Sequence, residues 1–101
     1  MSKIKVFIKK PSEKAYELKI NNSLAVLQDT VGGYVESVTV ADDLVILCDE
    51  EGRIKGKPYN CCISGVDFVG TVIIAGVDRE EFGDVPIDLD EARILFPELF
   101  K

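Results

Sequence analysis

Apolar and polar residues alternate along the first twenty positions of the chain and predict two strands. Between positions 4 and 8, isoleucine or valine recurs at every second residue. This period-two pattern is typical of a strand that buries one face. Pro11 and Ser12 form the predicted turn, and the alternation resumes over residues 16–20. We therefore expect the chain to begin with an antiparallel pair of strands.

A short helix is predicted over residues 23–31, because leucine and valine recur there at helical spacing. We expect Asn21-Asn22 to cap its start. Gly32 is the expected residue in the left-handed conformation that ends a helix. Beyond the helix, valines alternate with serine and threonine, which predicts a further strand that begins at Tyr34.

The unbroken apolar run over residues 44–48 predicts a central strand that is buried on both faces. We expect residues 50–52 to form a hairpin turn in which Gly52 adopts a positive φ, followed by a short return strand over 53–55. Residues 56–64 are predicted to form a loop. Residues 67–77 are predicted to form the longest strand of the domain.

The last quarter of the chain predicts a polar loop and a second helix. Charged residues, glycine and proline indicate a loop over residues 78–86. Asp88 is followed three residues later by Glu91, which is the spacing of a capping box. The predicted helix covers residues 88–96 and stops at Pro97.

Together these elements predict a single α+β domain over residues 1–101, with a mainly antiparallel sheet of about five or six strands and two short helices. A chain of 101 residues suits one domain that folds without disulfides or metal. Nowhere does an apolar run approach the roughly 20 residues of a membrane helix. The chain enters its first strand pattern at once, so we expect no signal peptide and no association with a membrane.

Residue types exclude several kinds of chemistry. The chain contains no histidine, which excludes Ser-His-Asp and Cys-His nucleophilic sites. Cys61 and Cys62 are adjacent, and this matches neither a zinc-ligand nor a redox spacing. We expect three reduced thiols, with Cys48 buried, which is typical of a cytoplasmic protein. We predict no catalytic residue, no metal site and no cofactor.

The acidic balance of the chain narrows the choice of partners. It contains 18 acidic and 12 basic residues, which gives a formal net charge of −6. Binding to duplex DNA depends chiefly on cations that neutralise phosphates. We therefore expect that this protein does not bind a nucleic acid duplex.

The best candidate binding site lies between residues 53 and 60, where cationic, aromatic and amide side chains are concentrated. The guanidinium of Arg53 suits a phosphate, and Lys57 adds positive charge. The ring of Tyr59 suits a planar base, Asn60 offers an amide, and Tyr34 provides a second wall. In the alternative interpretation, the tyrosine covers the core, the asparagine bonds the loop backbone, and the charges are solvated.

Three motifs carry a resemblance to a known family. They are the helix end Gly32-Gly33-Tyr34, the acidic turn over residues 49–52, and Pro58-x-Asn60. From the first strand to Gly76, the chain resembles a family of small bacterial and bacteriophage proteins that is catalogued only as a domain of unknown function, number 3846. The resemblance implies no known reaction. It implies a phage or mobile-element setting, in which small non-enzymatic proteins that disarm host defences are frequent.

These observations predict a non-enzymatic binding protein. In the leading hypothesis, a phage-type accessory protein sequesters a small anionic, nucleotide-like ligand, such as a signal of host immunity. The alternative is a protein–protein adaptor or an inhibitor of a host defence protein, which uses an exposed sheet edge or the apolar tail with Leu99 and Phe100.

The leading hypothesis also makes a prediction about assembly. Nanomolar affinity corresponds to about −12 kcal/mol, and one small open sheet rarely encloses a ligand well enough to supply it. Sequestration therefore predicts a homo-oligomer with a pocket shared between subunits. The apolar tail is expected to dock either on its own domain or on a second subunit.

Overall fold

The structure is a computed structural model that describes residues 3–79 and 81–101. It confirms an α+β fold built on antiparallel strands. The strands are β1 (Lys3–Lys9), β2 (Tyr16–Asn21), β3 (Val35–Ala41), β4 (Leu44–Asp49), β5 (Tyr59–Ile63), β6 (Val66–Val69), β7 (Val72–Asp78) and β8 (Glu81–Gly83). The helices are α1 (Leu24–Val31), α2 (Leu89–Leu95) and the 3-10 helix η1 (Pro97–Phe100).

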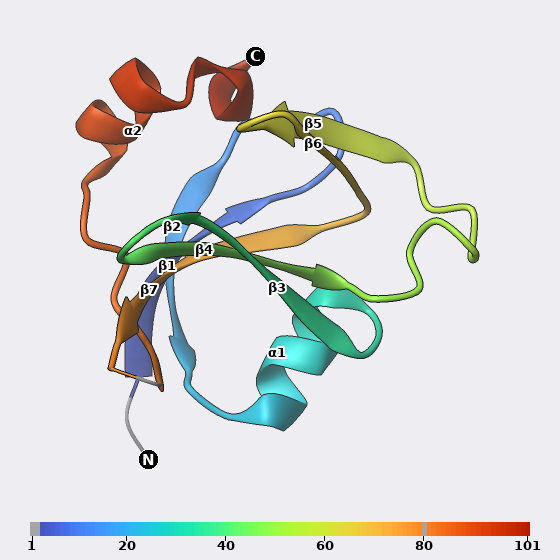
Figure 1. Ribbon diagram of the computed structural model, residues 1–101, viewed down its shortest axis with the longest axis horizontal. Helices are drawn as coiled ribbons and strands as arrows, with labels where there is room; N and C mark the ends of the chain where they lie inside the picture. Colours follow the sequence, from blue (N-terminus) through green and yellow to red (C-terminus); the bar gives the residue numbers. More distant parts are fainter. Residues whose placement is uncertain (1–2, 80) are drawn as a thin grey trace.

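The main sheet has the strand order β2-β1-β7-β4-β3, and every neighbouring pair is antiparallel (Figure 1). β7 is the middle strand: its Ile74 lies between Phe7 of β1 and Ile46 of β4. The short strand β8 pairs with the far end of β7. β5 and β6 form a separate two-stranded sheet. The main sheet therefore has β2 and β3 at its two edges.

Each face of the main sheet carries its own hydrophobic core. On one face, α1 packs Leu27 and Val31 against residues of β1, β4 and β7. The other face is covered by the β5–β6 sheet, α2 and η1, whose buried side chains include Phe68 and Leu99 (Figure 1). Because β4 and β7 lie between the two cores, almost all their residues are buried, as the unbroken apolar run over residues 44–48 predicted.

Several predicted details are confirmed. β1 and β2 pair antiparallel. Gly32 ends α1 with a φ of 80°, the left-handed conformation that glycine adopts without steric cost. The Asp88 side chain accepts a hydrogen bond of 2.8 Å from the Glu91 backbone N–H at the start of α2. The residue that caps α1 differs from the prediction, because Ser23 rather than Asn21-Asn22 accepts the hydrogen bond from Val26 N.

The predictions for residues 50–64 are wrong in two respects. Residues 50–56 form successive turns, so there is no return strand over 53–55, and the positive φ occurs at Gly56 rather than at Gly52. The segment predicted to be a loop contains β5, because Tyr59 and the residues from Cys61 to Ile63 pair with β6, and Cys61 and Ile63 pack in the core. β5 was not predicted because Asn60, Cys61 and Cys62 do not show the apolar–polar alternation of a strand.

The single long strand predicted over residues 67–77 is also wrong. Gly70 has a φ of 71°, which breaks the extended chain and separates β6 from β7. The two segments then join different sheets. The loop predicted over residues 78–86 contains β8, whose Phe82 lies opposite Val77. The apolar pattern over residues 67–77 therefore did not indicate the break at Gly70, and the polar composition of residues 78–86 did not indicate β8.

The apolar tail docks on its own domain. Leu99 is fully buried, and its carbonyl oxygen accepts a hydrogen bond of 2.8 Å from Ala15 N. Phe96 and Phe100 pack around the same core. None of the helices in the described part of the chain has the length and the apolar surface needed to cross a membrane.

The close approach of β7 to the segment after β8 yields a first prediction. A methyl group at Gly76 would overlap the backbone carbonyl of Asp84, whereas one at Gly83 would make only an ordinary contact with the Asp78 side chain. We expect Gly76→Ala to lower the free energy of unfolding by roughly 1–3 kcal/mol, the usual cost of forcing extra volume into a packed region. Denaturant unfolding measures this change. The matched control Gly83→Ala should stay within about 0.5 kcal/mol of the wild type. Equal losses in both variants would show that the close approach of Gly76 to Asp84 is not what limits the side chain at position 76.

Candidate functional site

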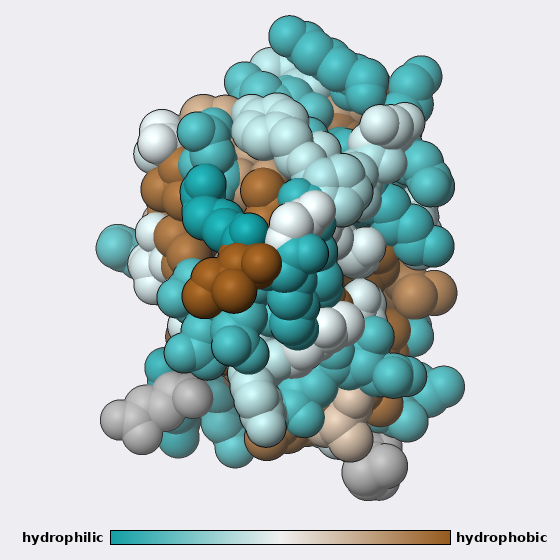
Figure 2. All heavy atoms as spheres, turned by 90° about the vertical axis from the view of Figure 1, so that its right-hand side faces the viewer, coloured by the Kyte–Doolittle hydropathy of each residue, from teal (hydrophilic) through white to brown (hydrophobic). Residues whose placement is uncertain are grey.

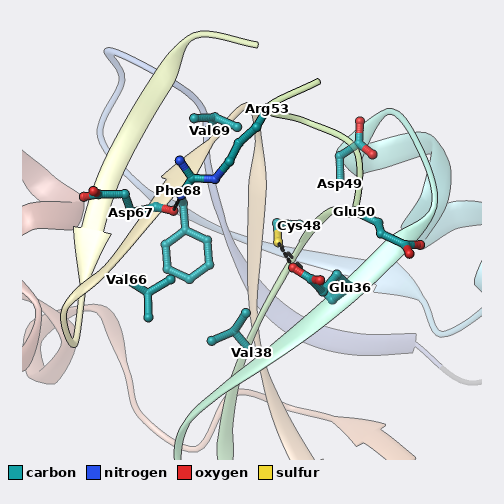
Figure 3. Close-up of a pocket in the computed structure, with 10 residues that line it drawn as sticks. All are labelled: Glu36, Val38, Cys48, Asp49, Glu50, Arg53, Val66, Asp67, Phe68 and Val69. Atoms are coloured by element: carbon teal, nitrogen blue, oxygen red, sulfur yellow. Dashed lines mark hydrogen bonds between the residues drawn. The ribbon is translucent and has the colours of Figure 1, made fainter. Parts of the chain in front are cut away.

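A cleft of about 120 Å³ lies between the edge strand β3 and the small β5–β6 sheet (Figure 3). We call it the Arg53 cleft. β3 and β4 form one wall, β6 forms the other, and the turns after β4 close one end. Its lining residues are Glu36, Val38, Cys48, Asp49, Glu50, Arg53, Val66, Asp67, Phe68 and Val69. The cleft thus combines an apolar interior with several charged side chains.

Arg53 crosses one end of the cleft toward β6 (Figure 3). Its Nη2 atom donates a hydrogen bond of 2.7 Å to the backbone carbonyl oxygen of Asp67. This contact joins the turns after β4 to an edge of the small sheet. The remaining guanidinium donors stay accessible, because Arg53 is exposed.

Glu36 and Cys48 lie together on the β3–β4 wall. The Cys48 thiol is 3.7 Å from the backbone oxygen of Glu36 and 3.9 Å from its Oε1 atom (Figure 3). Burial, together with the nearby carboxylates of Glu36 and Asp49, raises the pKa of the Cys48 thiol to about 11. The thiol is therefore protonated at neutral pH and is a poor nucleophile.

Asp49 organises the end of the cleft through a cluster of charged hydrogen bonds. Its side chain is only 1 % exposed, and its Oδ2 atom lies 2.8 Å from the ammonium groups of both Lys55 and Lys57. Its Oδ1 atom accepts a hydrogen bond of 2.9 Å from Glu51 N. These bonds to the two lysines hold the pKa of Asp49 well below its usual range.

The same two lysines also hold the end of α1. Lys57 Nζ donates to the carbonyl oxygens of Val31 and Gly32, at 2.7 and 3.3 Å. Lys55 Nζ donates to the Gly32 oxygen at 3.2 Å. The last carbonyls of a helix are unpaired within the helix and carry partial negative charge, so cations are stabilising there. Lys57 therefore serves the fold and is turned away from the Arg53 cleft.

Asn60 likewise bonds the backbone, as the alternative interpretation proposed. Its Nδ2 atom donates to the carbonyl oxygens of Lys9 and Gly70, at 2.8 and 2.7 Å. The residue is 9 % exposed. These bonds tie β5 to the end of β1 and to the break between β6 and β7, so the amide donors are not available to a ligand.

The two tyrosines of the predicted site are both exposed. Tyr59 is 58 % exposed, and its hydroxyl lies 3.4 Å from Oδ1 of Asp67. Tyr34 is 65 % exposed and directly precedes β3. Neither lines the Arg53 cleft. Of the five predicted site residues, only Arg53 lies in the cleft, and Lys57 and Asn60 face other parts of the fold.

Sequence reasoning missed most of the cleft, including Glu36, Asp67 and Phe68. These residues come from β3 and β6, which are far apart in the sequence and in different sheets. One signal was present for Glu36. It occupies the same face of β3 as Val38, and an acid on the apolar face of a strand is unexpected.

Size and charge limit what the Arg53 cleft can hold. Pockets for small-molecule ligands usually measure about 300–1,000 Å³, so 120 Å³ suits one side chain better than a nucleotide. The lining includes the carboxylates of Glu36, Glu50 and Asp67 beside the single cation Arg53. This balance disfavours an anion and favours a basic group.

The surface around the turns after β4 is mainly hydrophilic. Figure 2 shows this side of the molecule, where hydrophobic atoms form small separate patches among hydrophilic residues. Isolated apolar residues are normal on a soluble surface and do not mark an interface by themselves. The half-enclosed Arg53 cleft is therefore a better binding candidate than the open surface beside it.

Comparisons with known proteins give one match. The family model described as Domain of unknown function (DUF3846) matches residues 4–97, which is nearly the whole chain. No curated protein and no solved structure matches.

The Asp49 cluster yields a prediction on pH. Asp49→Asn removes both ion pairs, and we expect it to lower the free energy of unfolding by about 2 kcal/mol at pH 7, within the range for hydrogen bonds to charged groups. The pKa of Asp49 is lower in the folded than in the unfolded chain. The stabilisation is therefore present above the unfolded value of about 3.9 and is lost as the pH falls below it. Melting temperatures measured from pH 7 down to pH 2 should show the wild-type advantage over D49N shrinking below about pH 4.

A matched control is available in the turn between β3 and β4. Asp42 is exposed, so Asp42→Asn should leave the melting curve close to that of the wild type. An advantage over D49N that stays constant down to pH 2 would contradict the assigned role of the carboxylate.

Proposed function

Because the chain belongs to a family whose description assigns no activity, we propose a function from the geometry: it is a non-enzymatic binding protein that docks onto a partner protein through the Arg53 cleft. It would act as an adaptor or an inhibitor in the cytoplasm. The single observation that carries this proposal is a half-enclosed cleft of about 120 Å³ with an apolar interior and a carboxylate-rich lining.

The chemistry of the cleft defines the partner. Phe68 and Val38 offer an apolar surface on which the aliphatic stem of a long side chain packs. Glu36 and Glu50 offer negative charge to the head of that side chain. A projecting lysine or arginine satisfies both requirements. The net charge of −6 adds long-range attraction to a basic protein surface and would make association faster at low salt.

A second candidate is the sequestration of a small anionic, nucleotide-like ligand. The exposed rings of Tyr34 and Tyr59 and the accessible guanidinium of Arg53 favour it. The carboxylates that surround Arg53 oppose it, and the side chains of Lys57 and Asn60 make their hydrogen bonds within the fold. We therefore rank it second.

The family resemblance suggests a bacteriophage setting, and this setting indicates what kind of partner the protein would bind. In that setting the partner would be a protein of the host, and the adaptor or inhibitor would act against a host defence. A basic surface with a projecting lysine or arginine is the property by which such a partner would be recognised at the cleft.

Selection from a displayed library of random peptides tests the proposed function. We expect the protein to enrich peptides that contain lysine or arginine. Val66 lines the cleft and is 37 % exposed, so Val66→Trp would fill the cleft and should weaken binding of the enriched peptides at least tenfold. Fluorescence anisotropy of a labelled peptide measures this change.

Leu18 provides a matched control on the opposite edge of the sheet. It is 44 % exposed on β2, so Leu18→Trp adds the same ring away from the cleft and should leave binding unchanged. Failure to enrich any peptide would overturn the proposed function. Equal binding by the two tryptophan variants would show that the peptides bind elsewhere.

Native mass spectrometry separates the two candidates. If the protein binds a protein partner through the cleft, protein purified from cells should retain no nucleotide. A retained nucleotide that Arg53→Ala removes would instead support the second candidate. That substitution should cost roughly 1.5–3 kcal/mol of binding in that case, the range for a hydrogen bond to a charged group.

A further inference from the structure

Among the described residues, β3 is an edge strand with one unpaired side. In the described part of the chain, its one neighbour in the sheet is β4, and Figure 1 shows it crossing in front of β4. Glu50 N donates to the carbonyl oxygen of Tyr34, so this residue is bonded toward β4. Bonding alternates along an antiparallel pair. The backbone groups of Val35, Ser37 and Thr39 therefore point outward.

This edge has few of the features that usually prevent strands from pairing, since its one bulge lies at the far end, between Thr39 and Ala41. Natural edges are protected by lysines, prolines, bulges or very short strands. β3 has seven residues, and Glu36 is its only charged side chain. The opposite edge, β2, carries Glu17 and Lys19 within six residues. β3 is thus the less protected edge of the two.

We propose that the edge of β3 binds a second copy of this chain, strand to strand and antiparallel, about a two-fold axis at Ser37. In this arrangement Val35 lies opposite Thr39 of the partner subunit, and Ser37 lies opposite the partner subunit's Ser37. Each such pair exchanges two backbone hydrogen bonds, so the three outward-pointing residues form about six across the axis. The two main sheets become one continuous sheet.

The bulge of β3 selects this register. The pairing with β4 shifts between Thr39 and Ala41, which ends the outward alternation at Thr39. At the other end, Gly33 N already donates to the Gln28 oxygen. Centring the axis on Val38 or Glu36 would leave an outward residue without a partner, whereas centring it on Ser37 uses all three.

The side chains of β3 suit a copy of themselves. With the axis at Ser37, Glu36 lies opposite Val38 of the partner subunit, so no like charges face each other directly. Val35 and Thr39 are β-branched, as favourable cross-strand pairs often are. A two-fold interface requires this self-complementarity.

The dimer would also place two clefts side by side. Glu36 and Val38 line the Arg53 cleft and lie next to the axis. Because the two-fold axis is perpendicular to the continuous sheet, the sheet faces that carry the two clefts lie on the same side of the dimer. A partner with two basic side chains would then engage both clefts at once. The strand pairing itself does not depend on what the clefts bind.

Light scattering coupled to gel filtration tests this inference. The wild type should have about twice its 11.1 kDa chain mass at the upper end of a concentration series. Ser37→Lys and Ser37→Glu should each give the mass of a single chain, because like charges then meet at the axis. Ser37 is exposed, so neither variant should lose its fold, and circular dichroism checks this.

Mixing the two variants gives the decisive result. An equal mixture of Ser37→Lys and Ser37→Glu should restore the doubled mass, because opposite charges then face each other at the axis. Lys19→Glu on β2 is the control and should remain a dimer. The inference is overturned by a wild type that stays at 11.1 kDa throughout, by a single Ser37 variant that stays dimeric, or by a mixture that stays monomeric.

Discussion

The buried carboxylate of Asp49 is the interaction on which the arrangement of the candidate site depends. It ends the interior strand β4 and binds two lysines that also bind the last carbonyls of α1. One side chain thereby joins the main sheet, the turns over residues 50–56 and the helix on one face. A carboxylate at this depth is stable only because charged donors surround it. The ammonium groups of Lys55 and Lys57 therefore bond within the fold, to Asp49 and to the end of α1.

The geometry of the Arg53 cleft follows from this cluster. Lys55 and Lys57 bind Asp49 and so fix the turns after β4. From these turns Arg53 extends across the cleft and bonds the backbone of β6. The cleft is consequently spanned by a cation at one end and bordered by carboxylates elsewhere. Its apolar interior belongs to the same core that η1 and the β5–β6 sheet cover. Binding at this site would therefore be coupled to the position of the small sheet relative to β3.

Sequence patterns predicted the elements in which periodicity and burial agree, and failed where tertiary contacts decide. β1 and β4 were evident because apolar side chains occupy most of their buried positions, and β2 was evident from the alternation of Tyr16, Leu18 and Ile20 with charged residues. The break at Gly70 was not evident from the sequence, since an apolar run does not indicate that one of its residues has a positive φ. β5 was missed because Asn60 is buried by backbone contacts that are distant in sequence. Arg53 was predicted as a site residue from its local setting, but the cleft around it combines β3, β4 and β6, whose proximity no local pattern encodes.

The place of β7 in the sheet has a consequence for biosynthesis. β7 forms the centre of the sheet, between β1 and β4, yet it lies near the end of the sequence. A ribosome therefore releases β1, β2, β3 and β4 before the strand that joins the two hairpins exists. Until then, the apolar edges of β1 and β4 have no partner, and unpaired edges of this kind are prone to aggregation. Pairs as distant in sequence as Phe7 and Ile74 also slow folding, because the closure of a long loop precedes the contacts that stabilise it. The nascent chain is thus the state in which this protein is most exposed to aggregation.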